Sequence, residues 1–332
     1  MDAFNEEMCR IISHFFNRLS SIGGPLELKQ ELSDHVKGLQ HRMAEAIKFG
    51  SGDVKIGKDD MTVGFFRRVA LEMLCSNSRE MSFGRLFMIM SWNIMARAAN
   101  TVPICFSHLE WRNDALCVYF GHMKNDRRGT RPRDPRHMYA NPIMPEICPI
   151  LAIGVYWVSN GFNASNARLL PGRNQSERYR KVLKRVLATP SLMTELHRIG
   201  MTSDSIGTHS TRKGAVILCS SGSTACSSAI AVHLRDEWEM GGAQDRYLRQ
   251  GAAGDMLVGR TVNGLQFHEP EFAILHPLFD GGNADVERAT RITFSGLPTS
   301  AKQIGEFALA SLNKIPDSHP LFQSPLFRDD DR

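Results

Sequence analysis

The chain has 332 residues, 42% of them hydrophobic and 23% charged, and a formal net charge of +5. This length allows one large domain or two domains with a buried core, and the weakly basic balance permits a nucleic-acid partner without requiring one. The longest apolar run, at 86–96, is too short to span a membrane, and seven scattered cysteines without a CxxC pair predict a reducing compartment and no zinc site.

Two amphipathic helices are predicted at the N-terminus, over 4–19 and 28–47, separated by a Gly-Gly-Pro break at 23–25. Two such helices cannot bury their apolar faces alone, so we expect them to pack on another element or on a partner. Residues 50–58 then have the composition of a linker. Part of it resembles a phosphate-binding loop, but Asp59 stands where that motif needs a hydroxyl residue and no strand precedes it, so a nucleotide site is not favoured.

The next patterns predict helices over 63–75 and 82–100. The second is apolar on nearly every side, which is typical of a buried helix. Arg97 lies near its predicted end, and a buried guanidinium must be paired or meet an anion. If Arg97 is purely structural, Glu80 or Glu110 is the expected partner.

Residues 115–120 read as a strand, and the turn at 125–129 predicts a β-hairpin with Lys124 near its tip. An extended and basic segment follows at 131–136. A second basic run, at 178–185, lies on a predicted helix, where it is either a solvated face or a surface for an acidic partner. The basic residues expected to contact such a partner are Arg127, Arg128, Arg131, Arg133, Arg180, Lys181, Lys184 and Arg185, and Lys213 further along.

Further helices are predicted over 149–159, 176–188, 190–199, 211–221, 224–234, 239–249 and 300–312. The first turn of the 211–221 helix is expected to hold Arg212, beside amide groups that point at a bound phosphate. Glycine and proline punctuate the chain beyond residue 250, and the terminal residues 328–332 are expected to be disordered.

Two coincidences fall in the window 209–247. His209 is the only histidine followed three residues later by an arginine, Arg212, and Tyr247 is the only tyrosine with tryptophan or histidine nine residues earlier, at Trp238. Breaking a phosphodiester without a metal needs fixed positive donors, an in-line nucleophile and an acid for the leaving oxygen. A phenol can supply the nucleophile and form a covalent phosphotyrosyl intermediate.

The remaining roles follow from side-chain chemistry. Arg97 and Arg212 suit the non-bridging oxygens, because a planar guanidinium binds two oxygens and stays charged. Lys124 can protonate the departing hydroxyl. His209 can take the phenol proton or bond the phosphate, and Trp238 can donate its indole N–H.

The ordered set of an arginine, a hairpin lysine, HxxR, tryptophan and tyrosine resembles the tyrosine recombinase (phage-integrase-like) superfamily. The sequence around these residues, over about 60–265, resembles that of Crypton-type eukaryotic transposon recombinases. The short motifs that carry this resemblance lie at 122–126, 133–136, 140–142, 148–149, 244–247 and 259–261. The resemblance implies a mainly α fold with a small three-stranded antiparallel sheet. It divides the chain into a partial core-binding region at 1–56, a catalytic domain at 57–255 and a C-terminal extension at 256–332.

The resemblance further implies that the protein cleaves and rejoins double-stranded DNA through Tyr247, without metal or cofactor, as a tetrameric synapse in the nucleus. Three features depart from the pattern. Asn100 replaces the acidic residue that usually braces the first arginine, the N-terminal region is short, and Asp236 and Glu237 place acids near the phosphate. Two alternatives stay open: a catalytically silent, domesticated DNA-binding protein, and a type IB topoisomerase-like enzyme.

Overall fold

A computed structural model describes residues 57–120, 134–161, 167–236, 252–279 and 284–320, and isolated residues between 30 and 45. The chain separates into two compact units, Met1–Gly57 and Lys58–Arg332. The described residues between 30 and 45 are helical, in the middle of the second predicted N-terminal helix. The helix predicted over 4–19, most of the linker and the terminal residues 328–332 lie outside the described residues. The division proposed at 255–256 stays a prediction.

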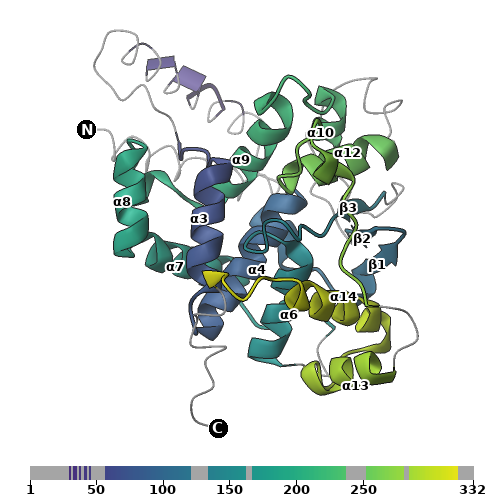
Figure 1. The fold of residues 1–332 in the computed structure, drawn as a ribbon. Coiled ribbons are helices and arrows are strands. Elements are labelled where there is room, and N and C mark those ends of the chain that lie inside the picture. The colour runs from purple at the N-terminus through teal and green to yellow at the C-terminus, as the bar shows by residue number, and fades with distance from the viewer. Residues whose placement is uncertain are drawn as a thin grey trace. The chain divides into compact units, whose positions relative to one another are not determined.

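The helix α4 (Arg79–Asn93) is the centre of the second unit (Figure 1). It is buried along most of its length and packs against α3 (Val63–Leu74), α6 (Pro149–Asn160), α7 (Gln175–Leu187) and α9 (Thr208–Ser221). The all-round apolar pattern therefore predicted its burial correctly. Among the described helices, none is both long enough and apolar enough to cross a membrane.

A small antiparallel sheet lies at the edge of the helical layer. Its strands β1 (Leu109–Arg112), β2 (Ala115–Val118) and β3 (Arg136–Met138) are arranged in that order. In the register, Leu109 is opposite Val118, and Cys117 is opposite His137. The mainly α fold with a three-stranded antiparallel sheet is confirmed. The tip of the predicted hairpin, with Lys124, lies outside the described residues.

The predicted helices after the sheet are confirmed within a few residues wherever the structure describes them. Beside those already named, the structure has these elements: α5 (Ala98–Thr101), α8 (Pro190–Arg198), α10 (Ala229–Arg235), α12 (Ala252–Val262), α13 (Ala284–Thr293), α14 (Lys302–Asn313), and 3-10 turns at Phe106–His108, Ser203–Ser205, Pro270–Ala273 and Thr299–Ala301. The helix predicted over 239–249 lies outside the described residues.

Three predicted helix ends were wrong. The helix predicted from 224 begins at Ala229, after the N-cap Ser228. The other two corrections affect the site. The helix predicted to reach residue 100 ends at Asn93, because Met95 takes a left-handed conformation with φ 51°. Arg97 is therefore extended (φ −68°, ψ 151°) and directly precedes the short α5. The helix α9 begins at Thr208 rather than 211, so His209 lies in its first turn and Arg212 in its second.

Two helices, α12 and α13, were not predicted, because the glycines of this region were read as breaks. In α12, Gly259 has a packing role: a Cβ there would lie 2.2 Å from the backbone carbonyl oxygen of His137. Gly254 is also tight, with a Cβ position 3.3 Å from Ala231. These glycines let α12 approach β3 and α10 closely. Their low helix propensity is the cost of this close packing.

Gly214 provides a test of this close packing. A Cβ at Gly214 would lie 1.8 Å from the carbonyl oxygen of Met61 and 2.9 Å from the ring of Trp92, whereas a Cβ at Gly64 in α3 meets nothing within 4 Å. We predict that Gly214→Ala lowers the free energy of unfolding by about 1–3 kcal/mol through overpacking. The matched Gly64→Ala change should leave it unchanged or raise it by up to about 1 kcal/mol. Denaturant unfolding of both variants measures the difference, and equal effects would contradict the packing described.

Candidate active site

The structure describes three of the six predicted catalytic residues: Arg97, His209 and Arg212. The other three, Lys124, Trp238 and Tyr247, lie in the segments 121–133 and 237–251, outside the described residues. The predicted DNA contacts Arg127, Arg128, Arg131 and Arg133 lie there too. The described residues on both sides of these segments nevertheless define where each segment begins and ends.

Arg212 forms a buried pair with Asp236, the residue that ends α10. Its Nε donates to the Asp236 carboxylate and its Nη2 to the Asp236 backbone carbonyl. Arg212 is 9% exposed and Asp236 only 1%. The contact therefore ties the second turn of α9 to the end of α10, immediately before the segment that contains Trp238 and Tyr247.

This pairing occupies only one edge of the Arg212 guanidinium. Arginine presents five N–H donors in a planar fork, with Nε and Nη2 on one edge and the two terminal nitrogens on the other. Asp236 takes the Nε edge, so the outer edge keeps donors that can bind two oxygens of an anion. The carboxylate can therefore hold the guanidinium in place without occupying its whole binding surface.

Arg97 does not form the ion pairs expected for a purely structural arginine. Glu80 pairs with Arg178 at 2.7 Å, and Glu110 pairs with Arg112 at 3.0 Å. Within the described residues, no carboxylate forms an ion pair with Arg97. Its backbone carbonyl accepts the N–H of Asn100 at 2.8 Å, so the short α5 fixes the backbone from which the guanidinium extends.

The Asp236 carboxylate lies in the electrostatic field of both arginines. Burial raises the pKa of Asp236, whereas Arg212, and more weakly Arg97 and His233, lower it. Arg212 contacts this buried acid directly, and the charge of Arg97, far from Arg212 in sequence, acts on it only through space. The Asp236 side chain is buried and contacts Arg212, and the expectation that acids lie near a bound phosphate stays a prediction. Glu237 lies outside the described residues.

His209 is exposed in the first turn of α9, one helical turn before Arg212. Lys213, four residues after His209, is also exposed, and its Nζ donates to the carbonyl oxygen of Lys58 at 2.6 Å. Residues four apart lie on the same face of a helix, so His209 and Lys213 share one exposed face at the start of α9.

The basic run on α7 is an exposed face. Lys181, Lys184 and Arg185 are exposed, and Arg180 pairs with Glu177 at 2.6 Å on the same helix. The opposite side of α7 is buried through Tyr179, Val182, Leu183, Val186 and Leu187. An amphipathic helix of this kind leaves three cations available to an acidic partner.

His137 in β3 and Asp255 in α12 form a second buried polar cluster. The carboxylate of Asp255 in α12 accepts hydrogen bonds from the backbone N–H of His137 at 2.7 Å and from its Nδ1 at 2.8 Å. Burial by itself would lower the pKa of His137, but its hydrogen bonds to Asp255 and Cys117 raise it to about 9. Burial would raise the pKa of Asp255, but the charge of Arg235 and the hydrogen bonds from His137 lower it well below its usual range. Sequence reasoning did not find this cluster, because no spacing links β3 to α12.

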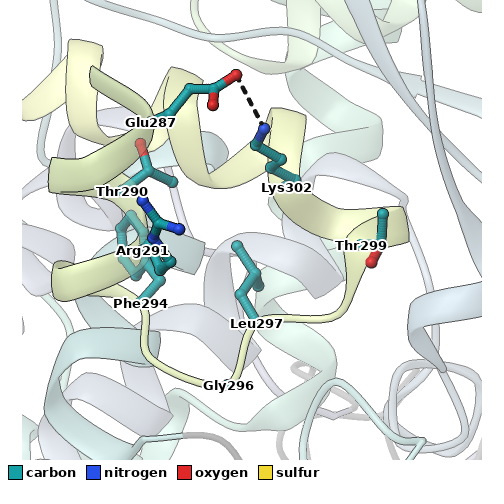
Figure 2. A pocket seen from close by; sticks show the side chains of 8 residues that line it. All are labelled: Glu287, Thr290, Arg291, Phe294, Gly296, Leu297, Thr299 and Lys302. Atoms are coloured by element: carbon teal, nitrogen blue, oxygen red, sulfur yellow. Dashed lines mark hydrogen bonds and ion pairs between the residues drawn. The ribbon is translucent and has the colours of Figure 1, made fainter. Parts of the chain in front are cut away.

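A cavity of about 250 Å³ lies elsewhere, between α13 and α14 (Figure 2). Glu287 and Lys302 form an ion pair of 3.2 Å across it, and Phe294 and Leu297 form part of its wall. It contains none of the predicted catalytic residues. In the part of the chain that the structure describes, no group of histidine, cysteine, aspartate and glutamate side chains is arranged to hold a metal ion.

No family model matches the sequence, and no curated protein matches it. Solved structures with a similar arrangement include a mutant of Flpe in complex with a DNA Holliday junction, with 12% identity and a TM-score of 0.49, covering 86% of this chain and 73% of the other. A Holliday junction complex of FLP recombinase gives 11% identity with the same TM-score and coverage. A likeness at this level of identity does not assign a function.

The His137–Asp255 pair predicts how stability depends on pH. Because the pKa of His137 is about 9 in the folded chain and near 6.5 when unperturbed, its contribution is fully present below pH 6.5 and is lost as pH rises through 9. We predict that His137→Gln lowers the free energy of unfolding at pH 6.5 and has a smaller effect above pH 9. Denaturant unfolding at the two pH values measures this. An effect that grows with pH would contradict the pairing.

Proposed function

We propose that this protein is a tyrosine recombinase that cleaves and rejoins DNA through a 3′-phosphotyrosyl intermediate on Tyr247. The observation that carries the proposal is the shared environment of Arg97 and Arg212, which both act on the buried Asp236. Two guanidinium groups that act on the same acid can together bind the two non-bridging oxygens of a phosphodiester, and among the described residues none is hydrogen bonded to the outer edge of Arg212. His209, exposed one turn before Arg212 on α9, is proposed to supply a ring nitrogen to the same phosphate.

The proposed chemistry uses groups of this chain alone. The Tyr247 hydroxyl attacks phosphorus, its proton passing to a base such as His209, and the bond from phosphorus to the 5′ oxygen breaks. Lys124 gives a proton to the departing 5′ oxygen. A 5′ hydroxyl then attacks the phosphotyrosyl bond, releasing Tyr247 and restoring the DNA. Because the arginines supply positive charge and Lys124 the proton, the scheme requires no metal or cofactor.

The described ends of the two remaining segments support this arrangement. The segment with Lys124 runs from β2 to β3, and the segment with Trp238 and Tyr247 runs from α10 to α12. The strand β3 is hydrogen bonded to α12 through His137 and Asp255, and Arg136 donates to the carbonyl of Leu234 in α10 at 2.8 Å. The described elements β3, α10 and α12, which border the two segments, are therefore hydrogen bonded to one another.

We further propose the biological setting that the sequence pattern suggests: integration or excision of a Crypton-like mobile element in the nucleus, by protomers that associate as a tetramer on double-stranded DNA. The exposed cations Lys181, Lys184 and Arg185 supply a surface for the DNA backbone. The competing proposal is a domesticated protein that binds DNA without cleaving it. Asn100 favours it, because an amide at that position adds no negative charge beside Arg97.

Covalent trapping distinguishes the two proposals. We predict that the full chain, incubated with a pool of nicked duplexes of randomised sequence, forms a protein–DNA adduct that survives detergent, because the nick lets the cleaved strand diffuse away. Tyr247→Phe should abolish the adduct, whereas the control Tyr119→Phe, which removes a hydroxyl bonded to Glu110 in the sheet region, should retain it. Gel separation after detergent measures both.

A binding-only protein would instead retain the duplexes in a salt-sensitive way and give no covalent band. An adduct that persists in Tyr247→Phe would exclude Tyr247 as the nucleophile.

The role of Asp236 gives a separate prediction. If its carboxylate braces Arg212, Asp236→Asn should slow adduct formation at saturating DNA on the order of 10-fold, because a neutral amide holds the guanidinium less firmly. The control Glu195→Gln removes one negative charge from an exposed pair with Arg198 and should leave the rate unchanged. If Asp236→Asn accelerates the reaction, the carboxylate competes with phosphate and does not brace the arginine.

A further inference from the structure

Arg235 is a fully buried cation whose side chain connects three separate elements. Its Nε and Nη2 donate to the carbonyl oxygen of Asn93 at 3.1 and 2.6 Å, and Nη2 also donates to the carbonyl of His137 at 2.9 Å. Its Nη1 donates to the Asp255 carboxylate at 2.6 Å and to the Asp255 carbonyl at 3.2 Å. The side chain is 0% exposed. All three guanidinium nitrogens are therefore engaged at the ends of α4, β3 and α12.

Each of these contacts lies beside a segment that contains a proposed catalytic residue. Asn93 ends α4, just before Arg97, and His137 is in the strand that follows the Lys124 segment. Asp255 lies in the first turn of α12, which follows the Tyr247 segment. Arg235 itself precedes Asp236, the partner of Arg212. One side chain thus joins the end of α4, strand β3 and the first turn of α12.

Both oxygens of the Asp255 carboxylate accept hydrogen bonds within this network. One oxygen of Asp255 accepts from Arg235, and the other accepts from the backbone N–H and the Nδ1 of His137. Replacing a buried ion pair by apolar side chains of similar volume is often neutral or stabilising, so stability alone does not explain such a network. Its hydrogen-bond geometry instead fixes the relative positions of the three elements.

We propose that Arg235, held by Asp255, is a positioning residue that sets the geometry between the arginine pair and the segments that contain Lys124 and Tyr247. This inference rests on the proposed recombinase chemistry and extends it to a residue that contacts neither DNA nor the reacting atoms. A planar guanidinium can reach all three elements at once, whereas an ammonium group with three donors on one atom cannot reproduce that fork.

The test compares two fully buried arginines in the full-length chain. Arg235→Lys removes the fork at the site, and Arg85→Lys removes an equivalent fork that bonds the carbonyls of Pro145 and Glu146 at 2.9–3.0 Å, away from the site. A nicked duplex recovered from the randomised pool is the substrate. The measurements are the rate constant of covalent adduct formation at saturating DNA, the DNA dissociation constant and the free energy of unfolding.

We expect Arg235→Lys to slow adduct formation on the order of 10- to 100-fold, with little change in DNA affinity, because misplaced reacting groups slow the chemical step. Arg85→Lys should lose stability and keep the rate constant, since a loss of folded protein reduces the amount of adduct and not its rate of formation. Asp255→Asn, which keeps the shape and removes the charge, should slow the reaction as Arg235→Lys does, and it provides the test if Arg235→Lys does not fold.

Two outcomes separate the claims. If the unmodified chain forms adduct but the variants at 235 and 255 react at the rate of Arg85→Lys, the positioning role is overturned and the recombinase function stands. If the unmodified chain forms no adduct on any duplex of the pool, the recombinase function fails and the positioning role fails with it.

Discussion

The arrangement of the candidate site depends on two adjacent buried charges at the end of α10. Arg235 bonds Asn93, His137 and Asp255, while the next residue, Asp236, pairs with Arg212. Neither charge can be withdrawn from water without partners, because an unpaired buried ion costs several kcal/mol. The chain therefore has to bring α4, α9, α12 and β3 together at this one point. Of the proposed catalytic residues, Arg212 is placed by the same requirement.

Much of the fold follows from local sequence patterns. The apolar periodicity predicted α3, α6, α7 and α8 within a few residues, because each buries one face against the same core. The failures have a common cause in tertiary contact. The helix α12 contains glycines that normally interrupt helices, and Gly259 is there because the backbone of His137 leaves no room for a side chain. Such close approaches are not visible in a single sequence.

The site was predictable only in part, because the sequence shows the candidate residues but not their tertiary partners. The order of Arg97, Lys124, HxxR, Trp238 and Tyr247 is a sequence property, and it identified the candidates without a structure. Their supporting partners were not identifiable. Glu80 and Glu110 were reasonable partners for Arg97 by composition, yet they pair with Arg178 and Arg112. Asp236 was read as an obstacle because its direction was unknown, and the structure shows it paired with Arg212.

The central claim is that residues far apart in the sequence meet at one phosphorus atom. A crystal structure of the full chain on a nicked duplex tests it most directly. We predict that Arg97 and the outer edge of Arg212 lie within hydrogen-bonding distance of the scissile phosphate and that Asp236 remains on the inner edge of Arg212. The Tyr247 hydroxyl of the same or a neighbouring protomer should lie in line with the leaving oxygen. A complex in which DNA lies away from Arg97 and Arg212, with no Tyr247 near the phosphate, would contradict it.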